Sequence, residues 1–384
     1  MKRKVAVVTG SRSEFGILYW VIKELESCND IECQLIVTGS HLAPSQGYTI
    51  SQIYDCGFKV KATVPMLLDG DSDEAIGYSI GMGVMGMTTE LKRLSPDIVL
   101  ILGDRFEIFS VATAAMALQI PIAHIGGGET DWASCIDGNI RNAITKMANI
   151  HFVSTQQYVN RIIKMGEESW RVFKTGMPSL DNIKDDLLSK DELQENLNVK
   201  FEGNIFLVTY LPVGLRIEES IEELKELLKA LEGFNKDTII FTLSNADAGG
   251  RKVNQCIKEF CKNNNNSYYF PTLGKKRYLS MLNICNIVIG NSSSGIIETP
   301  SFKRATINVG IRQNGRIHPN NVIDVIGDKH EIIKAINSAL YDEGFKIALQ
   351  NVKNPFGDGN ASKRIVEVLK NIQINRNLVE KKLV

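Results

Sequence analysis

The stretch 97–141, DIVLILGDRFEIFSVATAAMALQIPIAHIGGGETDWASCIDGNIR, decides the fold that the sequence predicts. Two apolar runs, 98–102 and 120–125, have the length and composition of buried parallel strands, and each run ends in glycine. Charged side chains follow both runs: Asp104, Arg105 and Glu107 after the first, and Glu129, Asp131 and Asp137 after the second. Because ligands bind at the carboxyl ends of the strands in an open parallel sheet, we expect an active site here.

The same alternation of apolar runs and amphipathic segments extends along the whole chain. The predicted strands are 5–8, 32–38, 98–102, 120–125, 151–154, 172–175, 205–210, 237–243, 268–270, 285–289 and 305–309. This pattern predicts an α/β fold of two Rossmann-type doubly wound domains. We place the first domain at 1–178, the second at 179–365 and a C-terminal helix and tail at 366–384. Residues 40–80 read as a loop-rich insertion, and the tail after about 373 as frayed.

Composition narrows the class of protein. Lys and Arg total 44 and Asp and Glu total 44 in 384 residues, so the chain as a whole lacks the basic character expected for nucleic-acid or anionic-membrane partners. The seven cysteines form no C-x-x-C pair, which favours reduced thiols and a cytoplasmic location. The run 5–8 is too short for a signal peptide, and no apolar stretch reaches the roughly 18–20 residues of a membrane span.

The segment 10–16, GSRSEFG, joins the first predicted strand to the first helix. It matches neither the dinucleotide fingerprint nor the Walker loop, so neither NAD nor ATP binding is indicated. Ser11 and Glu14 have the spacing of a capping box, which explains part of the segment by helix initiation alone. Arg12 is not needed for capping, and a guanidinium at a helix N-terminus suits a phosphate. The alternative is that Arg12 is a solvated charge.

A second candidate anion site is 290–295, GNSSSG, which follows a predicted strand and opens a helix. Small residues at such a turn let main-chain amides and hydroxyls approach a phosphate. Glu298, one turn into the helix, could accept two ribose hydroxyls, and Arg312 follows in IRQNGR. The alternative is a well-capped helix whose acidic residue only offsets the helix dipole.

The carboxylates of 97–141 suit proton transfer, because neighbouring acids can differ in pKa. Competing structural roles stay open: Asp137 could cap a helix, and Glu107 could offset a helix dipole. His124 could be a packed strand-end residue or part of the site. A metal site is less favoured, because the five histidines form neither H-x-x-x-H nor H-E-x-x-H.

Seven collinear motifs together resemble the UDP-N-acetylglucosamine 2-epimerase family, in its hydrolysing branch of sialic-acid and legionaminic-acid biosynthesis. The motifs, which span most of the chain, are GSRSEFG at 10–16, GDRFE at 103–107, HIGGGE at 124–129, D-x-x-I-R at 137–141, SNADAGGR at 244–251, GNSSSGIIE at 290–298 and IRQNGR at 311–316. The resemblance implies a GT-B-like fold with the active site in the cleft between the domains. It also implies a homodimer or homotetramer and no metal or redox cofactor.

The implied reaction takes a UDP-linked 2-acetamido sugar and removes the C2 proton with loss of UDP, and water then adds to the resulting glycal. The products are UDP and the free manno-configured sugar. The substrate is either UDP-N-acetylglucosamine or UDP-2,4-diacetamido-2,4,6-trideoxyglucose. By motif position the catalytic candidates are Asp104, Asp137 and Glu129. The candidates for binding UDP or the sugar are Arg12, His41, Arg105, Asn245, Arg251, Ser293, Ser294, Glu298 and Arg312.

The chain departs from the family pattern at two positions. The family has a histidine after the first strand of its second domain, where this chain has Leu211, and some relatives have a carboxylate where this chain has Gly126. Leucine can neither move a proton nor donate to a leaving diphosphate. A UDP-sugar-binding homologue without turnover therefore stays open, and a non-hydrolysing epimerase and a GT-B glycosyltransferase are two further alternatives.

Overall fold

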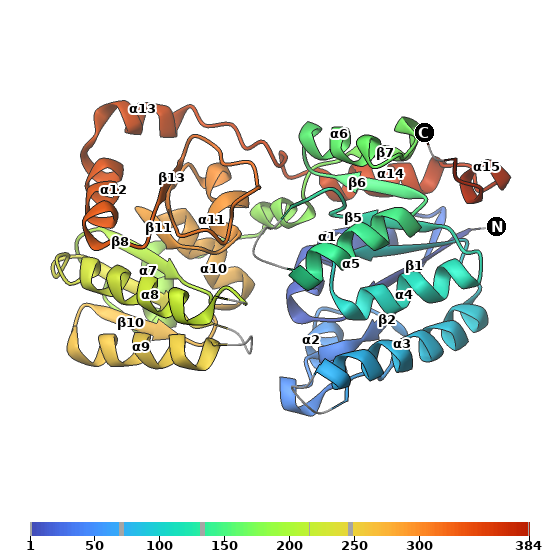
Figure 1. Cartoon of the computed structure of the whole chain (residues 1–384), viewed down its shortest axis with the longest axis horizontal. Helices are drawn as coiled ribbons and strands as arrows, with labels where there is room; N and C mark the ends of the chain where they lie inside the picture. Colours follow the sequence, from blue (N-terminus) through green and yellow to red (C-terminus); the bar gives the residue numbers. More distant parts are fainter. Residues whose placement is uncertain (1, 69–72, 131–134, 215, 245–248, 383) are drawn as a thin grey trace. The chain divides into compact units, whose positions relative to one another are not determined.

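The protein is described from a computed structural model that covers residues 2–68, 73–130, 135–214, 216–244, 249–382 and 384 (Figure 1). The chain forms two compact units. The first unit comprises residues up to 129, 135–182 and 356–384, and the second comprises Thr130 and 183–355.

The first unit is built on a seven-stranded sheet in the order β3-β2-β1-β4-β5-β6-β7, in which all pairs are parallel. Its strands are β1 (Arg3–Thr9), β2 (Ile31–Thr38), β3 (Val60–Val64), β4 (Ile98–Leu102), β5 (Ile122–Ile125), β6 (Ile150–Val153) and β7 (Val172–Lys174). The strand order reverses between β1 and β4. A ligand crevice is therefore expected beyond the carboxyl ends of these two strands.

Helices cover both faces of this sheet. They are α1 (Arg12–Ser27), α2 (Ile50–Asp55), α3 (Asp73–Leu94), α4 (Phe106–Ala117), α5 (Cys135–Met147), α6 (Gln156–Lys164), α14 (Ala361–Asn371) and α15 (Arg376–Val379). On one face, Leu18 of α1 and Leu369 of α14 join a buried cluster with strand residues. On the other face, Met87 of α3 and Val111 of α4 join a second cluster. The sheet is thus buried on both sides, as its uninterrupted apolar strands predict.

The second unit contains a six-stranded parallel sheet in the order β10-β9-β8-β11-β12-β13. Its strands are β8 (Ile205–Thr209), β9 (Thr238–Thr242), β10 (Ser267–Phe270), β11 (Ile287–Gly290), β12 (Ala305–Val309) and β13 (Val322–Val325). Its helices are α7 (Lys190–Leu197), α8 (Ile217–Leu231), α9 (Gly250–Asn263), α10 (Gly274–Ile284), α11 (Ser294–Ile297), α12 (Lys329–Tyr341) and α13 (Glu343–Gln350). The order reverses between β8 and β11, so Leu211 and the 290–295 turn follow neighbouring strands.

The predicted boundaries at 178/179 and 365/366 differ from those of the structure. The chain leaves the first unit after Asn182 and returns to it at Phe356. The return is fixed by polar contacts, because the buried carboxylate of Asp181 accepts hydrogen bonds from the main-chain N–H groups of Ala361 and Ser362 at 2.9 and 2.6 Å. In Figure 1 the last two helices, α14 and α15, in dark red, accordingly lie with the elements of the first unit.

The region 40–80 contains loops, as expected, and also α2, the edge strand β3 and the start of α3 at Asp73. The expectation of a frayed tail was wrong, because the tail after 373 is held in place. The buried guanidinium of Arg171 donates to the main-chain carbonyl oxygens of Leu378 and Asn377 at 2.8 and 2.7 Å.

Within the described residues, none of the helices combines the length and the apolar character that crossing a membrane requires.

Candidate functional site

The first predicted cluster forms at the turn after β4, residues 103–107, which we call the β4 turn. Gly103 has a φ of +84°, a conformation that favours glycine, and its N–H donates to the Ile125 carbonyl oxygen at 2.9 Å. The chain therefore bends at once into α4, whose N-cap is Arg105. This bend leaves Asp104 at the carboxyl end of the central strand.

Arg141 contacts two of the three predicted catalytic residues and lies near the third in the sequence of α5. Its Nη2 donates to the carboxylate of Asp104, and its Nη1 donates to the main-chain carbonyl oxygen of Glu129 at 3.1 Å. Arg141 lies on α5 one helical turn after Asp137, so the two share a face of the helix. Only 6% of the Arg141 side chain and 21% of the Asp104 side chain are exposed. The pair is therefore much less screened by solvent than a surface ion pair.

Arg105 is held by Glu107. Its Nε and Nη2 both reach the Glu107 carboxylate, with Nη2 at 3.1 Å from Oε1, while the carboxylate is fully buried and 42% of the Arg105 side chain is exposed. Burial lowers the pKa of Arg105, but the opposite charge and the hydrogen bonds of Glu107 raise it, and the net shift is upward. Glu107 therefore orients a guanidinium that still has an exposed surface for an anion.

Glu14 is a second buried carboxyl beside this pair. Its Oε2 accepts from the Gly10 N–H at 2.7 Å, and its Oε1 finds no hydrogen-bond partner among the described residues. The predicted capping box is only half formed, because Ser11 accepts from the Glu14 N–H while the Glu14 carboxyl bonds Gly10 instead of Ser11. Burial, reinforced by the charge of Glu107, raises the pKa of Glu14 to about 8. The Glu14 carboxyl is thus protonated in most of the protein molecules at neutral pH.

Arg12 and His41 differ in their surroundings. Arg12 is exposed in the first turn of α1, where helix amides would assist phosphate binding. His41 is buried in the short helix Gly39–Leu42, with Nε2 3.2 Å from Thr9 Oγ1 and Nδ1 2.8 Å from Thr49 Oγ1. Burial lowers the pKa of His41 to about 4, so its ring is neutral. Its predicted contact with the sugar stays a prediction, because both ring nitrogens are occupied by the protein.

In the second unit, Asn291 organises the loops after β8 and β11. Its buried side-chain amide donates to the Leu211 carbonyl oxygen and accepts from the Leu211 N–H, both at 2.7 Å. Its own carbonyl oxygen accepts from Arg312 Nη1 at 3.0 Å and from Gln313 Nε2 at 2.7 Å. Leu211 and the IRQNGR segment are therefore fixed to the start of the GNSSSG turn.

The other nucleotide candidates of this unit lie at or near the same turn. Ser293 is the N-cap residue of α11, and Ser294 Oγ accepts from Tyr278 Oη at 2.8 Å. Glu298 follows α11 and is partly buried. A Cβ at Gly290 would lie 2.0 Å from the Thr209 carbonyl oxygen, so only glycine allows the two strands to approach here.

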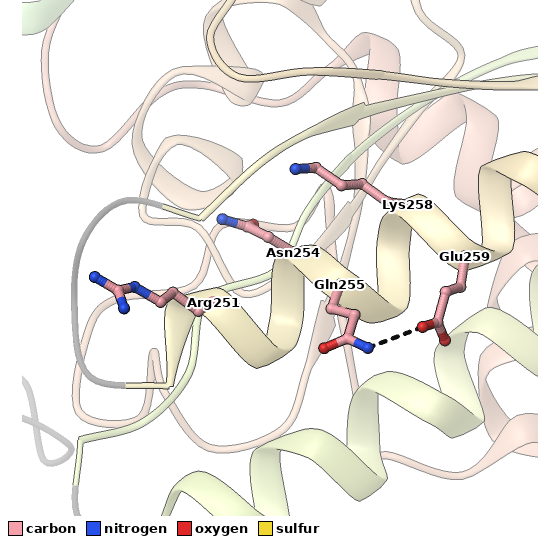
Figure 2. Close-up of a pocket in the computed structure, with 5 residues that line it drawn as sticks. All are labelled: Arg251, Asn254, Gln255, Lys258 and Glu259. Atoms are coloured by element: carbon pink, nitrogen blue, oxygen red, sulfur yellow. Dashed lines mark hydrogen bonds between the residues drawn. The ribbon is translucent and has the colours of Figure 1, made fainter.

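Arg251 lies in the first turn of α9, at a pocket of about 370 Å³ that Asn254, Gln255, Lys258 and Glu259 also line. Figure 2 shows these side chains along one stretch of the helix, with Gln255 donating to Glu259 at 3.0 Å. Arg251 and Lys258 carry two positive charges and Glu259 one negative charge, so the lining is net positive, which suits an anionic ligand. The predicted site residue Asn245 lies outside the described residues.

The structure also identifies residues that sequence reasoning missed. In the sequence Arg141 is only the last residue of the motif D-x-x-I-R, although its position four residues after Asp137 places both on one helix face. Glu14 was explained by capping, and nothing in the sequence shows that the chain buries it beside Glu107. Tyr278 and Asn291 act through contacts distant in sequence. Among the described residues, no group of three or more His, Cys, Asp or Glu side chains could hold a metal ion.

Comparison with known proteins assigns the family. The family model for UDP-N-acetylglucosamine 2-epimerase matches residues 23–370. The chain is 37% identical to a GDP/UDP-N,N'-diacetylbacillosamine 2-epimerase (hydrolyzing) of Campylobacter jejuni subsp. jejuni, over 89% of each chain. It is 32% identical to a UDP-N,N'-diacetylbacillosamine 2-epimerase (hydrolyzing) of Legionella pneumophila, over 99% of each chain.

A solved structure, the UDP-GlcNAc 2-epimerase of Neisseria meningitidis bound to UDP-GlcNAc, superposes with a TM-score of 0.84 at 20% identity. The match covers 95% of this chain and 99% of that chain, and it confirms the predicted GT-B-like class of two Rossmann-type domains. Fold, motifs and sequence identity agree, and the chain belongs to the UDP-N-acetylglucosamine 2-epimerase family.

Proposed function

We propose that the protein is a hydrolysing UDP-sugar 2-epimerase, which converts a UDP-linked 2-acetamido sugar to UDP and the free manno-configured sugar. The observation that carries the proposal is the arrangement around Arg141. This guanidinium binds the Asp104 carboxylate and the Glu129 main chain, and it lies one helical turn from Asp137. Two relatives that are 37% and 32% identical have names that include the hydrolysing reaction.

The chemistry needs a base and an acid at one carbon atom. In the first step a carboxylate takes the C2 proton, the C1–O bond breaks, the C2–H electrons form the C1=C2 double bond, and UDP leaves. In the second step water adds its hydroxyl to C1, and a proton returns to C2 from the opposite face. We assign these proton transfers to Asp104 and Asp137, with Glu129 as a third candidate, because positioned carboxyl groups can both accept and donate.

Departure of UDP needs positive charge near the diphosphate. We assign this role to Arg12 and Arg105 in the first unit. Arg105 is suited to it because Glu107 fixes its orientation while leaving part of it exposed. In the second unit, Ser293 and Ser294 are the proposed phosphate ligands and Glu298 the proposed ribose ligand. Arg251, Arg312 and Asn245 are proposed to line the nucleotide or sugar side.

The sugar is the finer part of the proposal. UDP-2,4-diacetamido-2,4,6-trideoxyglucose is the first candidate, because the names of two relatives contain UDP-N,N'-diacetylbacillosamine, which is the same compound. UDP-N-acetylglucosamine is the second candidate. A role in nonulosonic acid biosynthesis is supported by the name of a third relative at 36% identity, an Escherichia coli polysialic acid biosynthesis protein. We place the reaction in the cytoplasm.

A second candidate function follows from Leu211. Asn291 fixes the Leu211 main chain, and the leucine side chain offers no donor to a leaving diphosphate. A homologue that binds UDP-sugars without turning them over would have this arrangement. Incubation in D₂O separates the two functions: an epimerase incorporates one deuteron at C2 and releases UDP, whereas a binding protein shows UDP affinity by calorimetry and no exchange at C2.

We also propose a homodimer or homotetramer. Helices α3 and α4 pack together, and they expose the apolar side chains of Tyr78, Met85 and Met116. Contact between copies would cover this surface. Light scattering of the wild type and of the Tyr78→Lys/Met85→Lys double variant tests the idea. A monomeric mass for the wild type would overturn it.

A further inference from the structure

His124 is a buried histidine that the proposed reaction does not use. It lies in β5, directly opposite Ile101 of β4 and His151 of β6, and its side chain is fully buried. Its Nε2 lies 2.7 Å from the carbonyl oxygen of Gly103, the residue before Asp104.

The end of β5 therefore holds both polar main-chain groups of Gly103. The Gly103 N–H donates to the Ile125 carbonyl oxygen at 2.9 Å, and the Gly103 carbonyl oxygen accepts from His124. Gly103 follows the last residue of β4, and its φ of +84° turns the chain out of the strand direction at this point. These two hydrogen bonds fix the direction in which the chain enters Asp104.

The His124 ring is held in one tautomer and one charge state. A carbonyl oxygen only accepts, so Nε2 carries the hydrogen atom. Nδ1 is buried and has no hydrogen-bond partner in the part of the chain that the structure describes. Burial lowers the pKa of His124 to about 3, so the ring stays neutral. An imidazole that exchanged protons with a ligand would need one nitrogen atom that the ligand can reach, whereas Nδ1 is buried and Nε2 is bonded to the Gly103 carbonyl oxygen. The contacts of His124 are instead those of a single fixed donor.

We propose that His124 is a positioning residue: by holding the Gly103 carbonyl, it orients the β4 turn so that the Asp104 carboxylate meets Arg141 in one geometry. The proposal rests on the proposed function, because it assigns His124 a role through Asp104. It predicts an effect on the chemical step and not on nucleotide binding, since small displacements of a catalytic group can reduce rate by about 100-fold.

The test compares His124→Met, which has similar length and no donor, with His124→Gln, whose side-chain N–H can occupy the place of Nε2. We expect His124→Met to lower kcat by about 100-fold with KM and UDP affinity within about threefold of the wild type. His124→Gln should retain kcat within about tenfold. The matched control is His151→Gln, which changes the neighbouring buried histidine, whose Nε2 lies 3.2 Å from Glu167. It should leave kcat per folded molecule unchanged.

Several results would overturn the proposal. One is a His124→Met variant with wild-type kcat, and another is a loss confined to KM or shared equally by His151→Gln. If the variants do not fold, the ¹⁵N NMR spectrum of the wild-type histidines still tests the proposal. A hydrogen atom on Nδ1 of His124, or titration of His124 between pH 5 and 9, would contradict a neutral ring that donates from Nε2. Absence of turnover in the wild type would refute the proposed function. The tautomer measurement would still test whether His124 donates a hydrogen bond to the Gly103 carbonyl oxygen.

Discussion

Replacing Glu14 with glutamine should make the protein more stable at alkaline pH. The Glu14 carboxyl lies beneath the Gly10 loop, facing Glu107 of α4 and the charges of Arg105 and Asp104 in the β4 turn. Burial and the Glu107 charge raise its pKa from 4.5 to about 8. Glutamine keeps the size of the side chain and an oxygen that can accept from the Gly10 N–H, but it cannot ionise.

The sign follows from which state holds the proton. Below pH 4.5 the carboxyl is protonated in both the folded and the unfolded chain, so it adds no pH dependence. Between pH 4.5 and 8 the unfolded chain loses this proton while the folded chain keeps it, and the free energy of unfolding falls by about 1.4 kcal/mol per pH unit. Above pH 8 the penalty reaches roughly 3–5 kcal/mol, which Glu14→Gln lacks.

Thermal unfolding of both proteins at pH 5, 6, 7, 8 and 9 measures the effect. For a unit of this size, a difference of roughly 3–5 kcal/mol corresponds to about ten degrees in Tm. The advantage of Glu14→Gln should therefore grow from near zero at pH 5 to about ten degrees at pH 9.

A control with the opposite sign is Glu192→Gln. Hydrogen bonds from Ser189 lower the pKa of that exposed carboxyl, so the substitution should reduce Tm at neutral pH and have less effect in acid. A Tm difference for Glu14→Gln that does not change with pH, or that shrinks as pH rises, would refute the reasoning.

Three further predictions concern buried polar groups. Arg141→Met leaves Asp104 without its ion pair, so we expect a loss of about 3–5 kcal/mol by urea denaturation and a lower kcat, with partial recovery in Arg141→Lys. Arg171→Met removes the donors that hold the Leu378 carbonyl and the tail, so carboxypeptidase should shorten the variant faster than the wild type; equal digestion would contradict the assigned role. His41→Asn removes a buried neutral ring whose pKa is lowered to about 4. Wild-type stability should fall as pH drops from 6.5 towards 4, and this slope should be smaller in the variant; parallel profiles would contradict it.

Local sequence patterns predicted those helices and strands whose own residues show a clear apolar pattern. The run 98–102 is β4, and the repeated βα alternation gave both parallel sheets, because buried strands and amphipathic helices have distinct periods. The edge strand β3 was missed because it is short and only half apolar, as edge strands often are.

Contacts between distant residues could not be predicted in this way. The return of the chain at Phe356 depends on Asp181 meeting the start of α14, about 180 residues later in the sequence. The same limit applies at the site. Asp104 was found because a carboxylate at a strand end has few structural explanations, whereas its partner Arg141 became visible only from the packing of α5 against β5 and α4.

The most direct test of the proposed function is turnover of purified protein with UDP-2,4-diacetamido-2,4,6-trideoxyglucose and, separately, UDP-N-acetylglucosamine, followed by ¹H and ³¹P NMR. We predict that at least one of the two yields free UDP and the free manno-configured sugar in equal amounts. Asp104→Asn should lower the rate by about 100-fold or more, the range for loss of a general acid or base. A 2-epimer that stays linked to UDP, or no reaction with either sugar, would contradict the proposed function.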